Sequence, residues 1–220
     1  MNIKQVARLL NDVGVKTLAT DDFLKPDVDY GVNYYQLMIN KDNNKWEFLY
    51  VPREKRSSGG EEIIKTFDDE ASASKYYYLT ELHSYYRNYY VYPFQLGNKE
   101  INIGESNFTL KNLNEAFWRL NISKKYYSFD EKIKEYSMFL EKINKDESKV
   151  HFLGRGGKKV NSSLVLENWL AYYSMYRLVY TLYLFDKHYA DLIKNKEIAH
   201  IFTDEDYKTL LTGVVLESAQ

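Results

Sequence analysis

The stretch YGVNYYQLMINKDNNKWEFLYV, residues 30–51, decides the fold class. Its two ends are rich in aromatic and β-branched residues, which favour strands. Between them, residues 40–44 are Asn, Lys and Asp, which favour turns. Pro52 follows directly, and a proline cannot donate a hydrogen bond to a neighbouring strand. We therefore predict an antiparallel hairpin made of residues 30–39 and 46–51.

The segments after the hairpin extend this pattern. A charged loop that ends in glycine, residues 53–60, leads to a third short strand over residues 63–67. Three acidic residues then open a helix, because negative charge favours the N-terminal end of the helix dipole. This helix is expected over residues 68–90, and Pro93 is expected to end it.

Two shorter helices are expected elsewhere. Residues 2–12 carry apolar side chains at helical spacing, and Gly14 follows as a C-terminal stop. A second short helix over residues 113–120 carries Phe117 and Trp118, which we expect in the core.

The pattern changes in the second half of the chain. A capping sequence at residues 128–131 opens a predicted helix that runs to about residue 143. A polar break over residues 145–162 separates it from a long, buried helix over residues 163–194. Thr203 is expected to cap a last short helix.

Strands come first and helices follow, without regular alternation, so the sequence predicts an α+β fold. We expect a small antiparallel sheet in the N-terminal half, with helices packed on it, and a mainly helical C-terminal half. The chain, residues 1–220, is expected to form a single domain. A sub-boundary is possible near residue 121, between an α+β part (1–120) and a helical part (121–220).

The composition of the chain excludes several kinds of functional site and partner. The chain has 22 tyrosines, no cysteine and a formal net charge of −1. The absence of cysteine excludes disulfides, thiolate metal sites and thiol nucleophiles. A net charge this close to zero predicts no nucleic-acid partner. The N-terminus has no signal-peptide pattern, and the apolar window 164–185 contains charged residues, so we expect no membrane partner and a cytoplasmic location.

No motif predicts catalysis, a cofactor or a metal. The stretch FLGRGGKK, residues 152–159, lacks the spacing of a phosphate-binding loop, so we expect a flexible loop between helices, with an anion-binding nest as the alternative. The four histidines form no close pair, and we expect structural or surface roles for them. Acidic runs at 68–70 and 204–206 are explained by helix starts.

The stretch YYRNYY, residues 85–90, interleaves tyrosines with an arginine. Three interpretations remain open: a stacking platform for single-stranded nucleic acid, a protein-binding hot spot, and a core helix with wet edges. The neutral net charge disfavours the first.

Two segments, WEFLYVPR (46–53) and IIKTFDDEASASKYY (63–77), carry a family resemblance. The pattern resembles bacterial polymorphic-toxin immunity proteins, including the immunity factors of NAD-glycohydrolase-type toxins, over the N-terminal half only. The chain departs from the family pattern at Pro52 and Glu54, where the family has Glu and Gly, and only Arg53 of that turn is kept. The resemblance implies a non-catalytic protein that covers the active site of a toxin.

On this basis we expect a protein partner and no cofactor, and the oligomeric state is open. Two alternatives remain: a phage or mobile-element inhibitor of a host system, and an enzyme of unrecognised class with Glu54 or Glu61 as catalyst. The residues expected to contact the partner are Arg53, Glu54, Arg56, Glu61, Glu62, Tyr78, Tyr85, Tyr86, Arg87 and Tyr89.

Overall fold

The computed structural model describes residues 1–28, 31–53, 60–129, 134–195 and 202–214. The chain forms two compact units: Met1–Ser84 with the segment from Thr212 on, and Tyr85–Leu211. The division falls within helix α2 (Glu70–Tyr86). Residue 121, the possible sub-boundary predicted from the sequence, lies inside the second unit.

The first unit contains a five-stranded antiparallel sheet in the order β1-β2-β3-β4-β5. The predicted hairpin is confirmed, with Tyr35 opposite Tyr50 and Asn40 opposite Lys45. The predicted third strand is confirmed as β5, at the edge of the sheet. The strands are β1 (Thr17–Ala19), β2 (Phe23–Pro26), β3 (Tyr34–Asn40), β4 (Lys45–Val51) and β5 (Glu62–Phe67).

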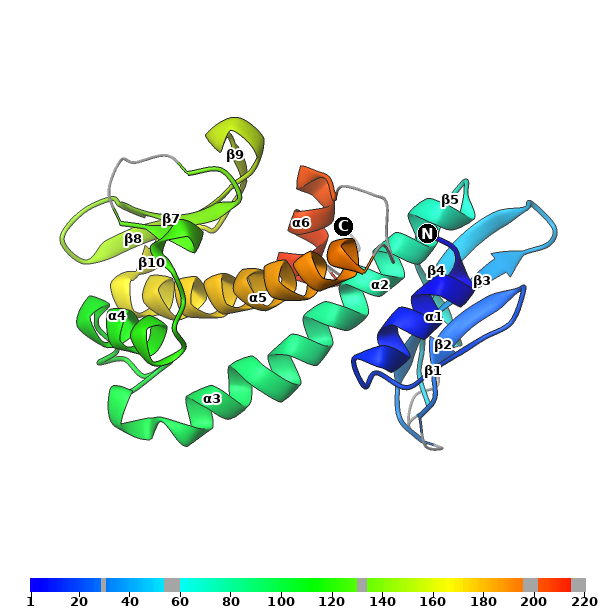
Figure 1. Ribbon diagram of the computed structural model, residues 1–220, viewed down its shortest axis with the longest axis horizontal. Helices are drawn as coiled ribbons and strands as arrows, with labels where there is room; N and C mark the ends of the chain where they lie inside the picture. The colour runs from blue at the N-terminus through cyan, green and yellow to red at the C-terminus, as the bar shows by residue number, and fades with distance from the viewer. Residues whose placement is uncertain (29–30, 54–59, 130–133, 196–201, 215–220) are drawn as a thin grey trace. The chain divides into compact units, whose positions relative to one another are not determined.

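One face of this sheet forms the core of the first unit. Leu37 of β3 pairs with Phe48 of β4, and both side chains are fully buried. The rings of Tyr76 and Tyr77 on α2 meet Phe48 edge-on, at centroid distances of 5.1 and 6.1 Å. Helix α1 (Ile3–Asp12) lies on the same side of the sheet as α2 (Figure 1). Because side chains alternate along a strand, the neighbouring residues of β3 and β4 point to the opposite face.

Helix α1 begins and ends close to the residues predicted from the sequence. The Asn2 side chain accepts a hydrogen bond from the Gln5 amide, and Gly14 follows the helix with φ at 94°. The Ile3 amide, which has no partner within its own helix, donates to the Glu70 carboxylate at 2.9 Å. The first turns of α1 and α2 are therefore linked by a hydrogen bond.

Pro93 was predicted to end the helix that begins at residue 68. This prediction was wrong, because the backbone stays helical beyond Pro93. The backbone passes from α2 through a π-helical segment, η1 (Arg87–Val91), into helix α3 (Tyr92–Gly97), with Pro93 in the first turn of α3. Proline lacks an N–H group and its ring collides with the carbonyl four residues earlier in an α-helix. The wider π turn, in which the Tyr92 amide bonds to the Arg87 carbonyl, relieves this conflict.

The second unit contains a second sheet, which the sequence analysis missed. Its strands are β6 (Tyr127–Ser128), β7 (Ser137–Lys142), β8 (Glu147–Leu153), β9 (Lys159–Ser162) and β10 (Leu166–Glu167). Strands β7 and β8 occupy the regions predicted as a helix over 128–143 and as a polar break over 145–162, so both predictions were wrong. Met138 and Leu140 are buried on alternate residues, a spacing that fits a strand as well as a helix.

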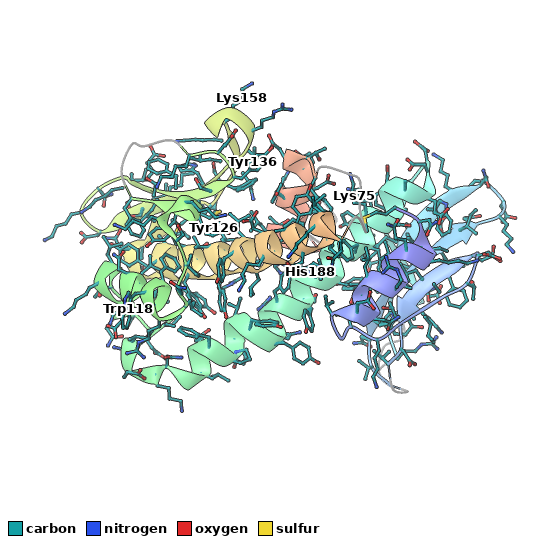
Figure 2. All side chains as sticks on the ribbon, in the orientation of Figure 1. Lys75, Trp118, Tyr126, Tyr136, Lys158 and His188 are labelled. Carbon is teal, nitrogen blue, oxygen red and sulfur yellow. The ribbon has the colours of Figure 1, made fainter. Side chains whose placement is uncertain are left out.

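Helices complete the second unit. The 27-residue α5 (Asn168–Lys194) confirms the predicted long helix, although it begins later because residues 166–167 form β10. Helix α4 (Leu110–Arg119) buries Phe117 as expected, but Trp118 is 79% exposed, which corrects its assignment to the core (Figure 2). Thr203 caps helix α6 (Asp204–Thr212), also as expected. Short 3-10 turns lie at η2 (Lys99–Ile101), η3 (Lys124–Tyr126) and η4 (Arg155–Gly157).

The α+β fold class is confirmed, with the antiparallel sheet in the N-terminal half and helices packed after it. In the described part of the chain, no helix is both long enough and apolar enough to span a lipid bilayer.

Candidate protein-binding surface

Exposed aromatic side chains gather where α2, η1 and α3 follow one another. Tyr89, Tyr92 and Leu96 are 69%, 52% and 50% exposed, and Tyr90 is exposed beside them. Tyr85 adjoins this group, half-buried. We call these five residues the tyrosine patch. Single exposed apolar residues are common on protein surfaces, whereas contiguous groups of large ones mark contact sites.

The rings of the patch pack on one another. The Tyr85 ring lies 5.0 Å from that of Tyr89 and 5.7 Å from that of Tyr90, measured between centroids. The centroid of the buried Tyr86 ring lies 6.2 Å from that of the Tyr90 ring. Tilted and edge-on ring pairs at these distances attract one another. The phenols of Tyr89 and Tyr90 are therefore held in place before any partner binds, which lowers the entropy lost on binding.

Burial, and after it the neighbouring Tyr90 hydroxyl, raise the pKa of the Tyr85 hydroxyl to about 12. The Tyr85 hydroxyl therefore keeps its proton at neutral pH and can donate a hydrogen bond. The surface at Tyr85 offers an apolar body with a polar tip, which is the combination that makes tyrosine frequent in interfaces.

The backbone beneath the patch is fixed to α5. The Tyr176 hydroxyl donates a 2.7 Å hydrogen bond to the Val91 carbonyl, and both residues are buried. The Phe94 ring lies 6.2 Å from the Tyr176 ring and 6.1 Å from the Tyr180 ring. These contacts hold one side of η1 and α3 against α5 and leave the tyrosines on the other side exposed.

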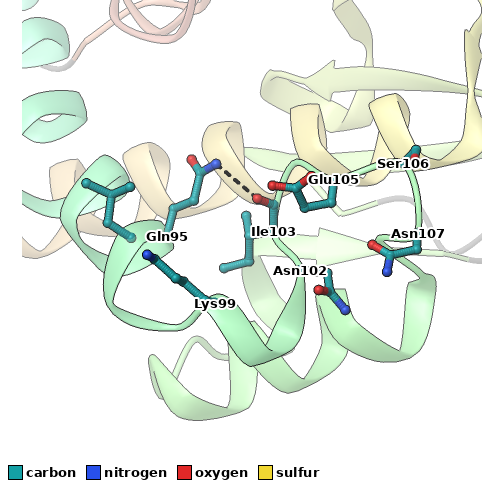
Figure 3. Close-up of a pocket in the computed structure, with 8 residues that line it drawn as sticks. Gln95, Lys99, Asn102, Ile103, Glu105, Ser106 and Asn107 are labelled. Atoms are coloured by element: carbon teal, nitrogen blue, oxygen red, sulfur yellow. Dashed lines mark hydrogen bonds between the residues drawn. The ribbon is translucent and has the colours of Figure 1, made fainter.

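A polar hollow of about 540 Å³ begins at the end of the patch, because Leu96 belongs to both. Figure 3 shows its lining, in which the Gln95 amide nitrogen donates to the Ile103 carbonyl at 2.9 Å. Among the described residues, neither the Lys99 ammonium nor the Glu105 carboxylate makes an ion pair. Aromatic anchors next to uncommitted charges are suited to a protein interface, where the anchors supply affinity and the charges fix orientation.

Three of the predicted contact residues lie at this surface. Tyr85 and Tyr89 belong to the patch, and the exposed Arg87 lies between them in sequence. Tyr78 and Tyr86 are buried, so their assignment as direct contact residues is corrected. Consecutive helical residues point in different directions, and in the pair Tyr85 and Tyr86 the second points inward.

The other predicted contact residues belong to the first unit. The exposed Arg53 donates through its amide to the Asn33 side chain at 2.7 Å and through its guanidinium to the Tyr34 hydroxyl at 3.3 Å. Glu61 and Glu62 are exposed at the start of β5. Glu54 and Arg56 lie outside the described residues.

Sequence reasoning missed Tyr90, Tyr92, Leu96 and Lys99 as members of the surface. The signal was present, because positions 85, 89, 92 and 96 follow the four–three–four spacing of one helix face. Because Pro93 was expected to end the helix, position 96 was not assigned to the same helix face as positions 85, 89 and 92.

The glycine-rich loop connects β8 and β9 and not two helices, which corrects the earlier expectation. Its amides bind anionic groups of the chain itself. The Arg155 amide donates to the Asp204 carboxylate at 3.1 Å, and the Gly156 amide donates to the Glu135 carboxylate at 2.9 Å. These two amides are therefore already bonded to carboxylates of the chain.

His151 lies buried between two polar partners on the second sheet. Its Nε2 is 2.6 Å from the Glu141 carboxylate and its Nδ1 is 2.7 Å from the Ser162 hydroxyl. Both ring nitrogens are satisfied by a neutral imidazole that donates to Glu141 and accepts from Ser162. Within the described ranges, no three His, Cys, Asp or Glu side chains are arranged to hold a metal ion.

Comparison of the chain with models of protein families, with curated proteins and with solved structures finds no match.

Proposed function

We propose that this protein is a cytoplasmic, non-catalytic binding module, an immunity protein that neutralises a cognate bacterial toxin by covering the toxin's active site. The observation that supports a binding function most directly is the tyrosine patch, with Tyr89 and Tyr92 exposed on a backbone fixed by the Tyr176 hydrogen bond. A protein that acts by occlusion needs a rigid face with aromatic anchors and no reacting groups.

The choice of a toxin as the partner rests on the resemblance of residues 46–53 and 63–77 to polymorphic-toxin immunity proteins. Genes for such immunity proteins lie beside those of their toxins, so the product of the neighbouring gene is the partner to test.

The test is co-expression of the tagged full chain with the neighbouring gene's product, followed by pulldown and measurement of affinity. A chain with Tyr89→Ala, Tyr92→Ala and Leu96→Ala is expected to lose about a hundredfold in affinity, because central aromatic residues supply most of the energy of an interface. Trp118→Ala is the matched control, since it removes an exposed aromatic side chain of α4 outside the patch. A monodisperse chain that never retains the neighbouring product, or a triple variant that binds as tightly as the parent, would contradict the proposal.

A further inference from the structure

A second hollow, of about 630 Å³, lies on the face of the first sheet opposite to α1 and α2. Met38 of β3 pairs with Glu47 of β4, and Leu49 of β4 pairs with Ile63 of β5. These residues alternate with the core residues Leu37 and Phe48, so their side chains point to the outer face. We call this depression the sheet-face hollow. All of its lining residues in the described part of the chain belong to the first unit.

The floor of the sheet-face hollow is apolar. Leu49 is almost completely buried, Met38 is half-buried, and Ile63 is 54% exposed at the edge of the sheet. An aliphatic chain laid over this floor would remove apolar surface of Met38 and Ile63 from water.

Its rim is acidic. Among the described residues that line the hollow, Asp22, Asp42, Glu47 and Glu61 are acidic and Lys41 is the one cation, so four carboxylates against one ammonium give these residues a net charge of −3. The Lys41 ammonium lies 2.7 Å from the Asp22 carboxylate and is thereby committed to it. Among the residues that the structure describes, Asp42 and Glu61 make no ion pair.

Glu47 distinguishes this hollow from an ordinary acidic surface. The residue is only 8% exposed, and its Oε1 accepts a 2.8 Å hydrogen bond from the Asn40 amide nitrogen, a neutral donor. Within the described part of the chain, no cation pairs with it. A buried carboxylate without a cation is costly, and a cation supplied from outside relieves that cost.

We propose that the sheet-face hollow binds an arginine side chain of a protein partner. The aliphatic stem of the arginine lies on Met38, Leu49 and Ile63, and the guanidinium reaches the Glu47 and Glu61 carboxylates. Arginine fits better than lysine because its planar group has five N–H donors for two carboxylates and loses its hydration more readily. This surface is independent of the tyrosine patch, and the proposal holds for any protein that presents a suitable arginine.

The probes are three capped peptides that differ only in the central residue: Ac-Ala-Arg-Ala-NH2, its lysine counterpart, and its citrulline counterpart, which is the neutral isostere of arginine. Each is titrated into the isotope-labelled full chain and followed by amide chemical shifts. The arginine peptide is expected to give saturable shifts at Met38, Glu47, Leu49 and Ile63, which weaken as salt is added. The citrulline peptide is expected to give none.

The variant Glu61→Gln removes an exposed carboxylate of the rim and is expected to weaken binding of the arginine peptide about fivefold. Asp191→Asn makes the same change of charge on the surface of α5 and is expected to leave affinity unchanged. Glu47→Gln tests the buried carboxylate, and an unchanged amide spectrum of the free variant confirms its fold.

Three results would overturn the proposal: no saturable shifts at the four residues, equal binding of citrulline, or equal affinity of Glu61→Gln. Equal affinity for the lysine peptide would overturn the assignment to arginine. The peptide test involves no toxin, so the two proposals can fail independently. Arginine binding can be absent while the tyrosine patch binds its partner, and arginine binding can be present while the patch binds no partner.

Discussion

The Tyr176 hydroxyl of α5 bonds to the Val91 carbonyl at the end of the π-helical segment. The contact joins residues that are 85 positions apart in sequence. It adds a second hydrogen bond to a buried carbonyl in a region where Pro93, which has no N–H, weakens the regular helical hydrogen-bond ladder.

Tyr176→Phe is expected to lower the free energy of unfolding by about 1 kcal/mol, because the ring is kept while the buried hydrogen bond to the Val91 carbonyl is lost. Urea denaturation of both proteins measures this difference. Tyr180→Phe is the matched control on the same helix, since among the described residues its hydroxyl makes no hydrogen bond, and it should cost less. Equal losses in the two variants would contradict a role for the hydrogen bond.

Glu81 should make stability fall as pH rises. Burial raises the pKa of its carboxyl from the ordinary 4.5 to about 7, so the folded chain holds a proton that the unfolded chain has released between these two values. The free energy of unfolding therefore decreases through this window, by about 3 kcal/mol in total, and is unaffected by Glu81 below it.

The measurement is urea denaturation at pH 5 and at pH 8. Glu81→Gln, which stays neutral at both, should lose most of the difference, whereas Glu62→Gln, at an exposed position of β5, should keep it. Equal stability of the parent chain at the two pH values would count against a protonated Glu81.

His151 should titrate below its ordinary pKa of 6.5. Burial lowers the pKa of its imidazole, and this effect outweighs the opposing hydrogen bond to the Glu141 carboxylate. As the pH falls below 6.5, the unfolded chain binds a proton before the folded chain does, so stability decreases until the lowered pKa is reached. The ring proton shifts of His151 in NMR spectra report this titration. Glu141→Gln should lower the pKa further, and a His151 pKa above 6.5 in the parent would refute the assignment.

Gly154→Ala should destabilise the second unit. A Cβ atom at this position would lie 2.5 Å from Cγ of Asp204 and 2.5 Å from Cγ2 of Val160, although the backbone at Gly154 has an ordinary negative φ. The side chains must move apart, and the hydrogen bond from Arg155 to Asp204 is lost, at a cost of about 1–3 kcal/mol. Gly97→Ala is the control, because open space surrounds its position. Thermal unfolding of the two variants should separate them clearly.

The first sheet could be predicted because local signals agreed. Residues 34–51 combine strand-forming ends with an Asn-rich turn, and the register follows from the hairpin. The second sheet could not be predicted in this way. Positions 136, 139, 140 and 143 fit a helical spacing, while the burial of Met138 and Leu140 follows the period of a strand. Its pairing depends on contacts between strands, which no local pattern records.

The sequence predicted that the binding surface is rich in tyrosine, but not which tyrosines are exposed on it. The excess of phenols identified Tyr85 and Tyr89, but adjacent tyrosines give no indication of which one points inward, and Tyr86 and Tyr78 are inside. The π turn before Pro93 has no sequence signal that distinguishes it from a helix end. The sheet-face hollow depends on the pairing of three strands, so Glu47 could not be recognised as buried from its position alone.

The chain leaves the first unit after Ser84 and returns to it at Thr212, where a Cβ atom added to Gly213 would lie 2.8 Å from the His83 ring. The second unit is therefore an insertion between two segments of the first. During synthesis on a ribosome, the inserted unit emerges whole, whereas its host must wait for the segment from Thr212 before its last contacts can close. A premature stop codon just before Thr212 would accordingly damage the host unit, although the sheet of that unit would already have been translated in full.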